Sequence, residues 1–312
     1  MNKILKNPNV SRKLGIIASL LVMCVVFTCL TNRFLTLNNM LNIFQQASIN
    51  LCVAVGMTFV IITGGIDLSV GSVMALSGMI MAQMMERGVA PIIGVILGLA
   101  LATLLGALNG VLIAKLKLQP FLVTLGTMSA YRGLTLIISN GLPVRSFSSA
   151  YVNFMSSLNG FIPLPIIISL VLAICAMIVL KYFKFGQYLL AVGGNEEATR
   201  LSGINTDKIK IITYGFSGFA SAVAALIFLG RLAAADPQAG NGYEMNAIAA
   251  AAIGGASMAG GKGSIVGTII GCLILQTLNN GLTLMNVQSF YQTFAIGVIV
   301  LVATIIDRYS SK

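Results

Sequence analysis

The residue best placed to do chemistry in this sequence is Asp67, an acid with apolar chain on both sides. It lies in the run GGIDLSVG at 64–71. An ionised carboxylate at bilayer depth costs roughly 3 kcal/mol, so such a group normally faces a partner, a cavity or the interior of a helix bundle. The adjoining glycines permit chain reversal and close backbone approach. The run is therefore a candidate for a functional break in a membrane-spanning structure.

Other residues suited to catalysis or metal binding are scarce. The sequence has no histidine, the commonest metal ligand and general base. Its five cysteines lie in apolar runs without CxxC spacing, which favours small core residues over ligands or disulfides. The run 256–263 (ASMAGGKG) departs from a phosphate-binding loop at Ala256 and Gly263 and follows an apolar segment instead of a strand. We expect no catalytic residues, no metal site and no cofactor on this chain.

The composition is that of a polytopic membrane protein. Of 312 residues, 57% are hydrophobic and 9% are charged, against roughly 25% charged residues in soluble domains. The net charge of +11 does not indicate a nucleic-acid partner, because Lys and Arg lie mainly between apolar segments and form no basic-aromatic cluster. The first apolar segment follows basic residues but precedes no small-residue cleavage site, which favours a retained span over a signal peptide.

Apolar runs separated by polar, glycine or proline breaks predict an all-α protein with about ten transmembrane helices. The expected limits are 14–31, 47–63, 70–85, 90–114, 119–138, 163–180, 209–231, 246–259, 264–282 and 290–306.

The connecting charges favour both termini in the cytoplasm. With the N-terminus inside, fourteen basic residues fall on the inner side and five on the outer, as the positive-inside rule requires. Residues 1–13 are then a cytoplasmic tail, and 183–208 is the longest cytoplasmic connection. The inner residues are Lys3, Lys6, Arg12, Lys13, Lys115, Lys117, Lys181, Lys184, Arg200, Lys208, Lys210, Lys262, Arg308 and Lys312; the outer ones are Arg33, Arg87, Arg132, Arg145 and Arg231.

The two halves of the chain predict inverted repeats of five spans each. Span four carries Gly94 and Gly98, and span nine carries Gly267 and Gly271 at the same spacing. Spans five apart run in opposite directions, so the repeats would be inverted. Spans three and eight are both short and adjoin glycine-rich breaks, a pattern that favours lining of a translocation path. The alternative is that these glycines serve helix packing alone.

A short capped helix is predicted at 195–203 in the cytoplasmic connection. Asn195 suits the N-cap, Glu196 and Glu197 suit the first turn, and Gly203 suits a left-handed C-terminal position. A helix of about two turns is marginal alone in water, so it has to dock on something. Its own bundle and a cytoplasmic partner are the two alternatives.

Three separate motifs resemble the membrane permease of ribose-type ABC sugar importers. They are the run 64–71, the stretch 193–203 (GGNEEATRLSG), and 242–250 followed by 254–263. The resemblance extends from about Phe34 to Asp307. Permeases of this family serve ribose, allose, galactose, xylose and autoinducer-type sugars.

The resemblance implies one permease domain over 1–312 that imports a monosaccharide, most favourably ribose or a related sugar, across the bacterial cytoplasmic (inner) membrane. It implies a second permease copy, separate cytoplasmic ATPase subunits that bind ATP and magnesium, and an extracytoplasmic sugar-binding protein. The short helix predicted at 195–203 would then be the coupling helix, which binds the ATPase. Its residues for this contact would be Asn195, Glu196, Glu197, Ala198, Thr199, Arg200 and Gly203.

A neutral polyol requires hydroxyl and amide partners along its path. Each candidate could equally form a helix-helix hydrogen bond. The candidates for the substrate path are Asn50, Thr63, Asp67, Ser69, Asn246, Ser257, Gln276 and Asn279.

For Asp67 a structural role competes with sugar contact. Unless the preceding span is re-entrant, the loop charges put 64–69 at a turn near the cytoplasmic face. There the carboxylate precedes a short helix, and Ser69 could share the capping. A structural cap is the favoured interpretation. Inverted repeats, broken spans and Asp67 as proton carrier also fit a secondary transporter driven by an ion gradient, although the chain lacks histidine and has few acids within its spans.

Overall fold

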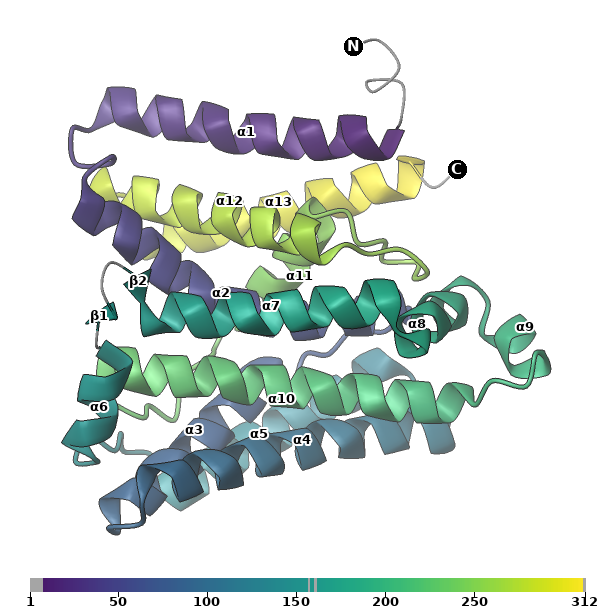
Figure 1. Ribbon diagram of the computed structural model, residues 1–312, viewed down its shortest axis with the longest axis horizontal. Coiled ribbons are helices and arrows are strands. Elements are labelled where there is room, and N and C mark those ends of the chain that lie inside the picture. Colours follow the sequence, from purple (N-terminus) through teal and green to yellow (C-terminus); the bar gives the residue numbers. More distant parts are fainter. Residues whose placement is uncertain (1–7, 157, 160–161, 311–312) are drawn as a thin grey trace.

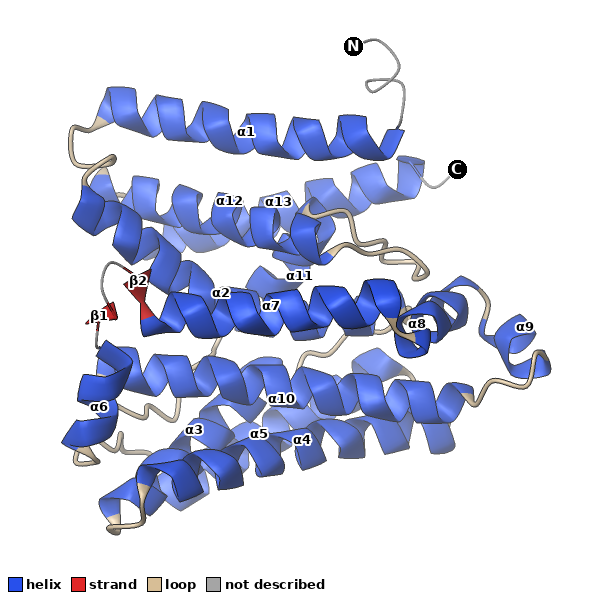
Figure 2. Cartoon of the chain, viewed as in Figure 1, coloured by secondary structure: helices blue, strands red, loops and turns tan. Residues whose placement is uncertain are grey.

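The computed structural model describes residues 8–156, 158–159 and 162–310. This part of the chain is helical apart from one antiparallel pair of two-residue strands, β1 (Leu158–Asn159) and β2 (Ile162–Pro163) (Figure 2). The predicted all-α class is confirmed. Six described helices are long and apolar enough to cross a membrane: α2 (Leu37–Ile62), α4 (Pro91–Lys115), α5 (Pro120–Ser139), α7 (Leu164–Tyr182), α10 (Thr206–Leu232) and α12 (Ile265–Leu284). The others are α1 (Pro8–Leu30), α3 (Val70–Glu86), α6 (Ser149–Ser156), α8 (Lys184–Gly194), α9 (Glu196–Leu201), α11 (Tyr243–Ile253) and α13 (Ser289–Ser310).

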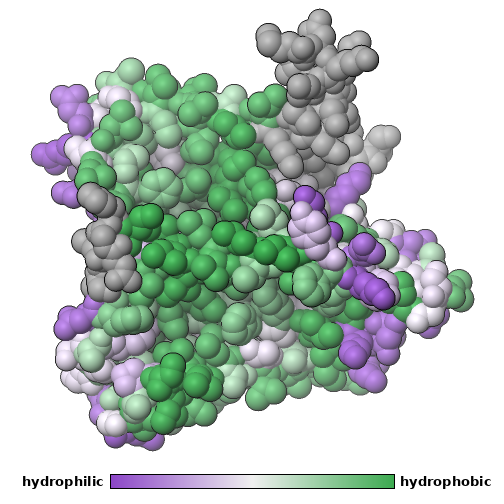
Figure 3. Space-filling view, in the orientation of Figure 1, coloured by the Kyte–Doolittle hydropathy of each residue, from purple (hydrophilic) through white to green (hydrophobic). Residues whose placement is uncertain are grey.

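The bundle carries an apolar belt between two polar ends. Hydrophobic side chains cover the middle of the face in Figure 3, and hydrophilic residues gather toward its left and right edges. Large apolar side chains on the long helices are exposed, including Leu104 on α4 at 67% and Ile137 on α5 at 73%. An exposed apolar surface of this extent indicates contact with lipid. Helix α1 begins and α13 ends at the end of the bundle that bears α9, and α6 and the strands lie at the other (Figure 1).

Several helix boundaries differ from their predictions, and for two of them the structure gives the physical reason. Helix α2 begins at Leu37 instead of residue 47, because its polar first part has partners on α12. Asn39 and Asn280 exchange side-chain hydrogen bonds of 2.9 and 2.8 Å. Helix α11 ends at Ile253, six residues before the predicted limit of 259, because Gly255 adopts φ +91° and turns the chain.

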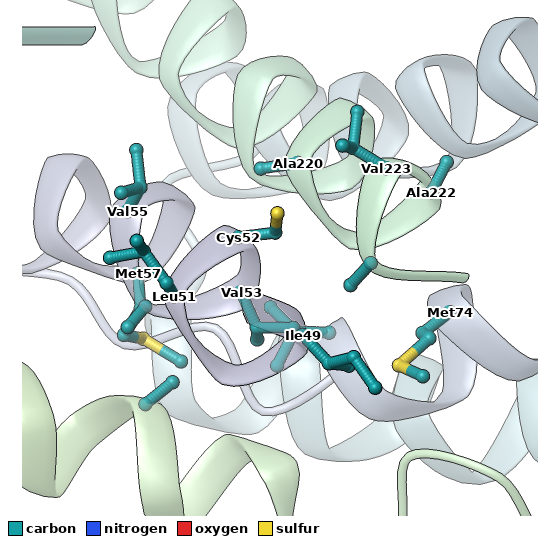
Figure 4. Packing of buried hydrophobic residues seen from close by; sticks show 14 of the residues in the cluster. Ile49, Leu51, Cys52, Val53, Val55, Met57, Met74, Ala220, Ala222 and Val223 are labelled. Carbon is teal, nitrogen blue, oxygen red and sulfur yellow. The ribbon is translucent and has the colours of Figure 1, made fainter. Parts of the chain in front are cut away.

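The core lies between α2 and α10, whose side chains are mostly buried (Figure 4). Small residues bring the two backbones together: a Cβ added at Gly56 would lie 3.0 Å from the Cα of Ser217. Cys52 and Cys272 are buried core residues, as predicted, whereas Cys29 and Cys175 are exposed and Cys24 is partly buried. All five are free thiols.

The repeated glycines pack helices together within each half of the chain. A Cβ added at Gly98 on α4 would come within 2.5 Å of Met81 on α3. One at Gly271 on α12 would come within 2.1 Å of the carbonyl oxygen of Ala250 on α11. The packing role of both pairs is confirmed, and each pair joins a full-length helix to a short one.

A leucine at Gly106 is expected to destabilise the bundle, because α4 touches α10 there. A Cβ at Gly106 would lie 2.2 Å from the carbonyl oxygen of Tyr214, and overpacking of this kind costs about 1–3 kcal/mol. The melting temperature in detergent should fall by several degrees in Gly106→Leu and not in Gly15→Leu, where no atom lies within 4 Å. Equal melting temperatures for the two variants would contradict the packing assignment.

Candidate transport pathway and coupling helix

Asp67 lies in the connection between α2 and α3, where both of its carboxylate oxygens have partners. Oδ1 accepts hydrogen bonds from the backbone N–H of Ser69 (3.0 Å) and from its hydroxyl (2.6 Å). Oδ2 accepts one from the hydroxyl of Ser217 on α10 (2.8 Å). The side chain of Asp67 is 1% exposed. The carboxylate therefore fastens the connection to α10, and its role as a path residue stays a prediction.

This connection lies deeper in the bundle than the predicted turn near one face. Ser217 lies 11 residues after Thr206, the first residue of α10, which corresponds to about 16 Å along the helix axis at ~1.5 Å per residue. The depth could not be deduced from loop charges, because they count crossings and contain no information about chain that folds back into the bundle. The short helix α3 therefore starts inside the protein.

The expectation that Ser69 shares the capping is wrong. Ser69 is the N-cap residue of α3, but its side chain makes no capping hydrogen bond. Its hydroxyl donates to Asp67 and accepts from the side-chain amide of Asn109 on α4 at 2.9 Å. Asn109 in turn accepts from the hydroxyl of Tyr131 on α5 at 3.3 Å. The first turn of α3 is thus held by a buried network that joins α4, α5 and α10.

Removing the carboxylate is expected to destabilise the protein more than removing its charge. Asp67→Ala leaves the buried hydroxyls of Ser69 and Ser217 without their acceptor, at about 1–3 kcal/mol for each unsatisfied group. Asp67→Asn keeps an acceptor oxygen toward Ser69, so its loss should be smaller. Thermal unfolding of the two variants in detergent measures the difference, and a larger loss in Asp67→Asn would mean that the charge itself is required.

The other predicted path residues fall into one cluster and several separate positions. Asn50 on α2 donates to Gln276 on α12 at 3.4 Å, and Gln276 also donates to Gln46. Asn279 lies one turn further along α12, and its Oδ1, like that of Asn50, is a buried acceptor without a hydrogen-bond partner in the described chain. The amide pairs act as helix-helix hydrogen bonds between α2 and α12.

Thr63, Asn246 and Ser257 lie on different elements. The hydroxyl of Thr63 donates to the carbonyl of Val60 at 2.7 Å at the end of α2. Asn246 is half-buried on α11, and Ser257 is buried in the connection that follows that helix. Within the described chain, neither Thr63 nor Asn246 is hydrogen-bonded to the network of Asp67. The predicted set thus does not form one site.

Helix α9 has the predicted capping. The side chain of Asn195 accepts from the N–H of Ala198 at 2.9 Å, and Gly203 adopts φ +82° after the helix. Glu197 accepts two hydrogen bonds from Arg200, at 2.7 and 2.9 Å, and they raise the pKa of the guanidinium. Lys210 at the start of α10 binds Glu196 at 2.6 Å. These contacts fix a helix of six residues that projects beyond the bundle (Figure 1).

The connection 183–208 contains a second helix that was not predicted. Helix α8 buries Gly186, Leu189 and Val192, one face at a spacing of three residues. Its end touches the end of α2: a Cβ added at Gly193 would lie 1.7 Å from the carbonyl oxygen of Ile62. That carbonyl also accepts from the N–H of Gly261, in the connection between α11 and α12, at 2.9 Å. We name Ile62, Gly193 and Gly261 the glycine junction.

The charge count assigned Arg132 to an outer connection, and the structure does not place it there. It lies in the interior of α5, and its Nη1 donates to the carbonyls of Pro237 and Ala239 at 2.5 and 2.8 Å. The positive-inside count assigned this residue to a side of the membrane without considering whether it lies within a helix. A basic residue within an otherwise apolar helix is itself a signal for a functional position, and together with Glu244 on α11 it was missed.

These features define a membrane transport protein: an all-helical bundle with an apolar belt, short helices that start inside it, and a capped helix that projects from one end. The chain belongs to the family of the branched-chain amino acid transport system permease component, which matches residues 39–304.

Three relatives support this assignment in detail. The ribose import permease protein of Escherichia coli strain K12 is 44% identical over 297 residues, 93% of this chain and 92% of that protein. The ribose import permease protein of Bacillus subtilis strain 168 is 44% identical over 304 residues, 97% of this chain and 94% of that protein. The D-allose transport system permease protein of E. coli K12 is 39% identical over 302 residues, 96% of this chain and 93% of that protein. No solved structure matches the chain.

The comparisons confirm the resemblance to permeases of ribose-type importers. The chain is a transport permease and not an enzyme, since its family is the permease component of a transport system. The motifs at 64–71, 193–203 and 242–263 all lie within the range covered by the family.

Proposed function

We propose that this chain is the permease of an ABC importer that carries a monosaccharide, most favourably ribose or a related sugar, across the bacterial cytoplasmic membrane. The observation that carries the proposal is the 44% identity to a ribose import permease over 93% of the chain. The D-allose relative at 39% identity keeps the substrate class to sugars and leaves room for different members of it.

The proposed topology has ten spans and both termini in the cytoplasm. Its support is that α1 begins and α13 ends at the end of the bundle that bears α9 (Figure 1). An even number of crossings follows from that arrangement. The bias of basic residues toward the same side adds the orientation.

The proposed inverted repeats relate α1–α5 to α7 and α10–α13. In the first half α3 packs against α4, α5 and α10. In the second half α11 packs against α12, α13 and α2, which are the corresponding helices if span numbers are shifted by five. Matching contacts of two short helices are what such repeats require.

The proposed assembly contains two copies of this chain, two ATPase subunits and an extracytoplasmic sugar-binding protein, with the path between the copies. ATP and magnesium bind the ATPase subunits. Helix α9 is the proposed docking element, because its outer surface is free: Leu201 is 79% exposed, and the Arg200–Glu197 pair is exposed as well. The binding protein would meet the opposite end, near α6.

The deciding experiment is transport in proteoliposomes. Purified permease should import labelled D-ribose only when the cognate ATPase, the binding protein and ATP are all present. Uptake by the permease alone on a proton or sodium gradient would replace the proposal with a secondary transporter. A supply of leucine instead of sugar tests the substrate named in the family description.

A further inference from the structure

A polar cavity of about 180 Å³ lies where α3, α5 and α11 meet. It is lined by Ser72, Ser129, Arg132, Gln238, Asn241 and Glu244, with Met128 as its apolar contact. Two larger cavities, one between α2, α7 and α12 and one beside α6, are lined almost entirely by apolar side chains. Such cavities suit lipid chains, whereas the polar one suits a hydrated or hydroxylated molecule.

Two of the lining side chains have no partner of their own. The amide groups of Gln238 and Asn241 are exposed, and within the described chain neither makes a side-chain hydrogen bond. Each amide offers two N–H donors and one acceptor oxygen. A pair of unpartnered amides at one cavity presents complementary groups to the hydroxyls of a ligand.

Two charged side chains complete the cavity without giving it a net charge. Arg132 uses Nη1 for the carbonyls of Pro237 and Ala239. Glu244 accepts from the N–H of Gly242 at 3.2 Å through Oε1. Within the described chain, Nη2 of Arg132 makes no hydrogen bond, and the hydrogen bonds of the Glu244 carboxylate come from backbone N–H groups alone. Ionisable residues held inside a membrane bundle normally mark a substrate or ion pathway.

The cavity lies where two short helices begin. Helix α3 starts at Val70 and α11 at Tyr243. The first turn of α3 meets the chain just before α11 at a pair of glycines, since a Cβ at Gly71 would lie 2.1 Å from the carbonyl oxygen of Gly240. Half-helices that start inside the bilayer form the substrate sites of many transporters, because their free N–H groups face the cavity.

The lining favours a neutral polyol over an amino acid. A zwitterion could use Arg132 and Glu244, but a branched apolar side chain would find only Met128 beside hydroxyls, amides and charges. A sugar can use each of these polar groups through its hydroxyls.

We propose that this cavity is a binding site for the transported sugar within the permease, with Gln238, Asn241, Arg132 and Glu244 as hydrogen-bonding partners. The inference rests on the proposed sugar transport. The site differs from the Asp67 network, whose polar side chains are buried and hydrogen-bonded to one another. The proposed site instead opens beside Ser129 on the exposed face of α5.

The test combines transport with chemical protection in the complete complex. Gln238→Ala together with Asn241→Ala should lower D-ribose uptake per ATP hydrolysed about tenfold, as expected for two lost hydrogen bonds. The matched control is Asn42→Ala, an exposed amide on α2 without a hydrogen bond in the described chain. In a second measurement, Ser129→Cys in a background with the five native cysteines replaced should react with a water-soluble maleimide, and D-ribose, but not leucine, should slow the reaction.

The outcomes separate the two levels of the proposal. If the unmodified complex imports no sugar, the proposed function fails. If it imports sugar, while the double variant matches Asn42→Ala in sugar moved per ATP and D-ribose leaves maleimide labelling unchanged, the site assignment alone fails. Loss of transport together with sugar protection supports the site even where one variant expresses poorly.

Discussion

Replacing Glu197 by Lys and Ala198 by Arg is expected to abolish ATP-driven sugar uptake and leave the permease folded. Both residues lie on the exposed surface of α9, and in the described chain the Glu197 carboxylate is hydrogen-bonded to Arg200 alone. The double variant changes the local charge by three positive units, and unfavourable charge contacts at an interface cost several kcal/mol. Affinity for the ATPase should then fall by about 100-fold or more. Copurification with the ATPase and ATP-driven uptake in proteoliposomes measure the two effects.

The control for this variant is Glu86→Lys, an exposed charge reversal at the end of α3. This variant reverses the charge of an exposed acid that lies away from α9. It should bind the ATPase normally and support normal ATP-driven uptake. If the α9 variant retains both ATPase binding and uptake, α9 is an ordinary connector and the energy enters elsewhere.

An alanine at Gly193 is expected to disconnect α8 from the membrane helices. The added methyl group would lie 1.7 Å from the carbonyl oxygen of Ile62 and 2.5 Å from the amide nitrogen of Gly261. Backbone atoms cannot rotate away as a side chain can, so α8 must shift. Overpacking of this kind costs about 1–3 kcal/mol. ATP-driven uptake should be lost, because the glycine junction connects α8, the helix directly before α9, to the end of α2 and to the connection before α12.

Gly194→Ala is the matched control, since no atom lies within 4 Å of a Cβ at that neighbouring position. The two variants introduce the same group one residue apart, so helix propensity cannot explain a difference between them. ATPase binding should survive in Gly193→Ala, which distinguishes a broken transmission from a broken docking surface. Equal transport by both variants would remove the glycine junction from the mechanism.

The local features of this molecule could be predicted from the sequence because their determinants are close together in the chain. The cap at Asn195 and the left-handed Gly203 flank one short helix, and both are as expected. Apolar segments gave the positions of the long helices for the same reason. Each of these features depends on residues within a few turns.

The misplaced features depend on partners far along the chain. Asp67 is deep because its carboxylate meets Ser217, 150 residues later. Arg132 lies within the bundle because the carbonyl of Pro237 accepts its hydrogen bond there, and Pro237 is 105 residues away in the sequence. A charge count treats such residues as isolated and puts them at the surface, whereas buried charges are stable inside a bundle when partners are supplied.

The amide contacts between α2 and α12 have a consequence for biosynthesis. Asn39 is the hydrogen-bond partner of Asn280, 241 residues later in the chain. The polar first part of α2 therefore leaves the ribosome long before α12 has been made, and unsatisfied amides are costly in hydrocarbon. Until α12 has entered the bilayer, Asn39 keeps only its local hydrogen bond to the carbonyl of Phe34 and lacks its partner on α12. Maturation of the first half of the protein is thus completed only when translation is nearly over.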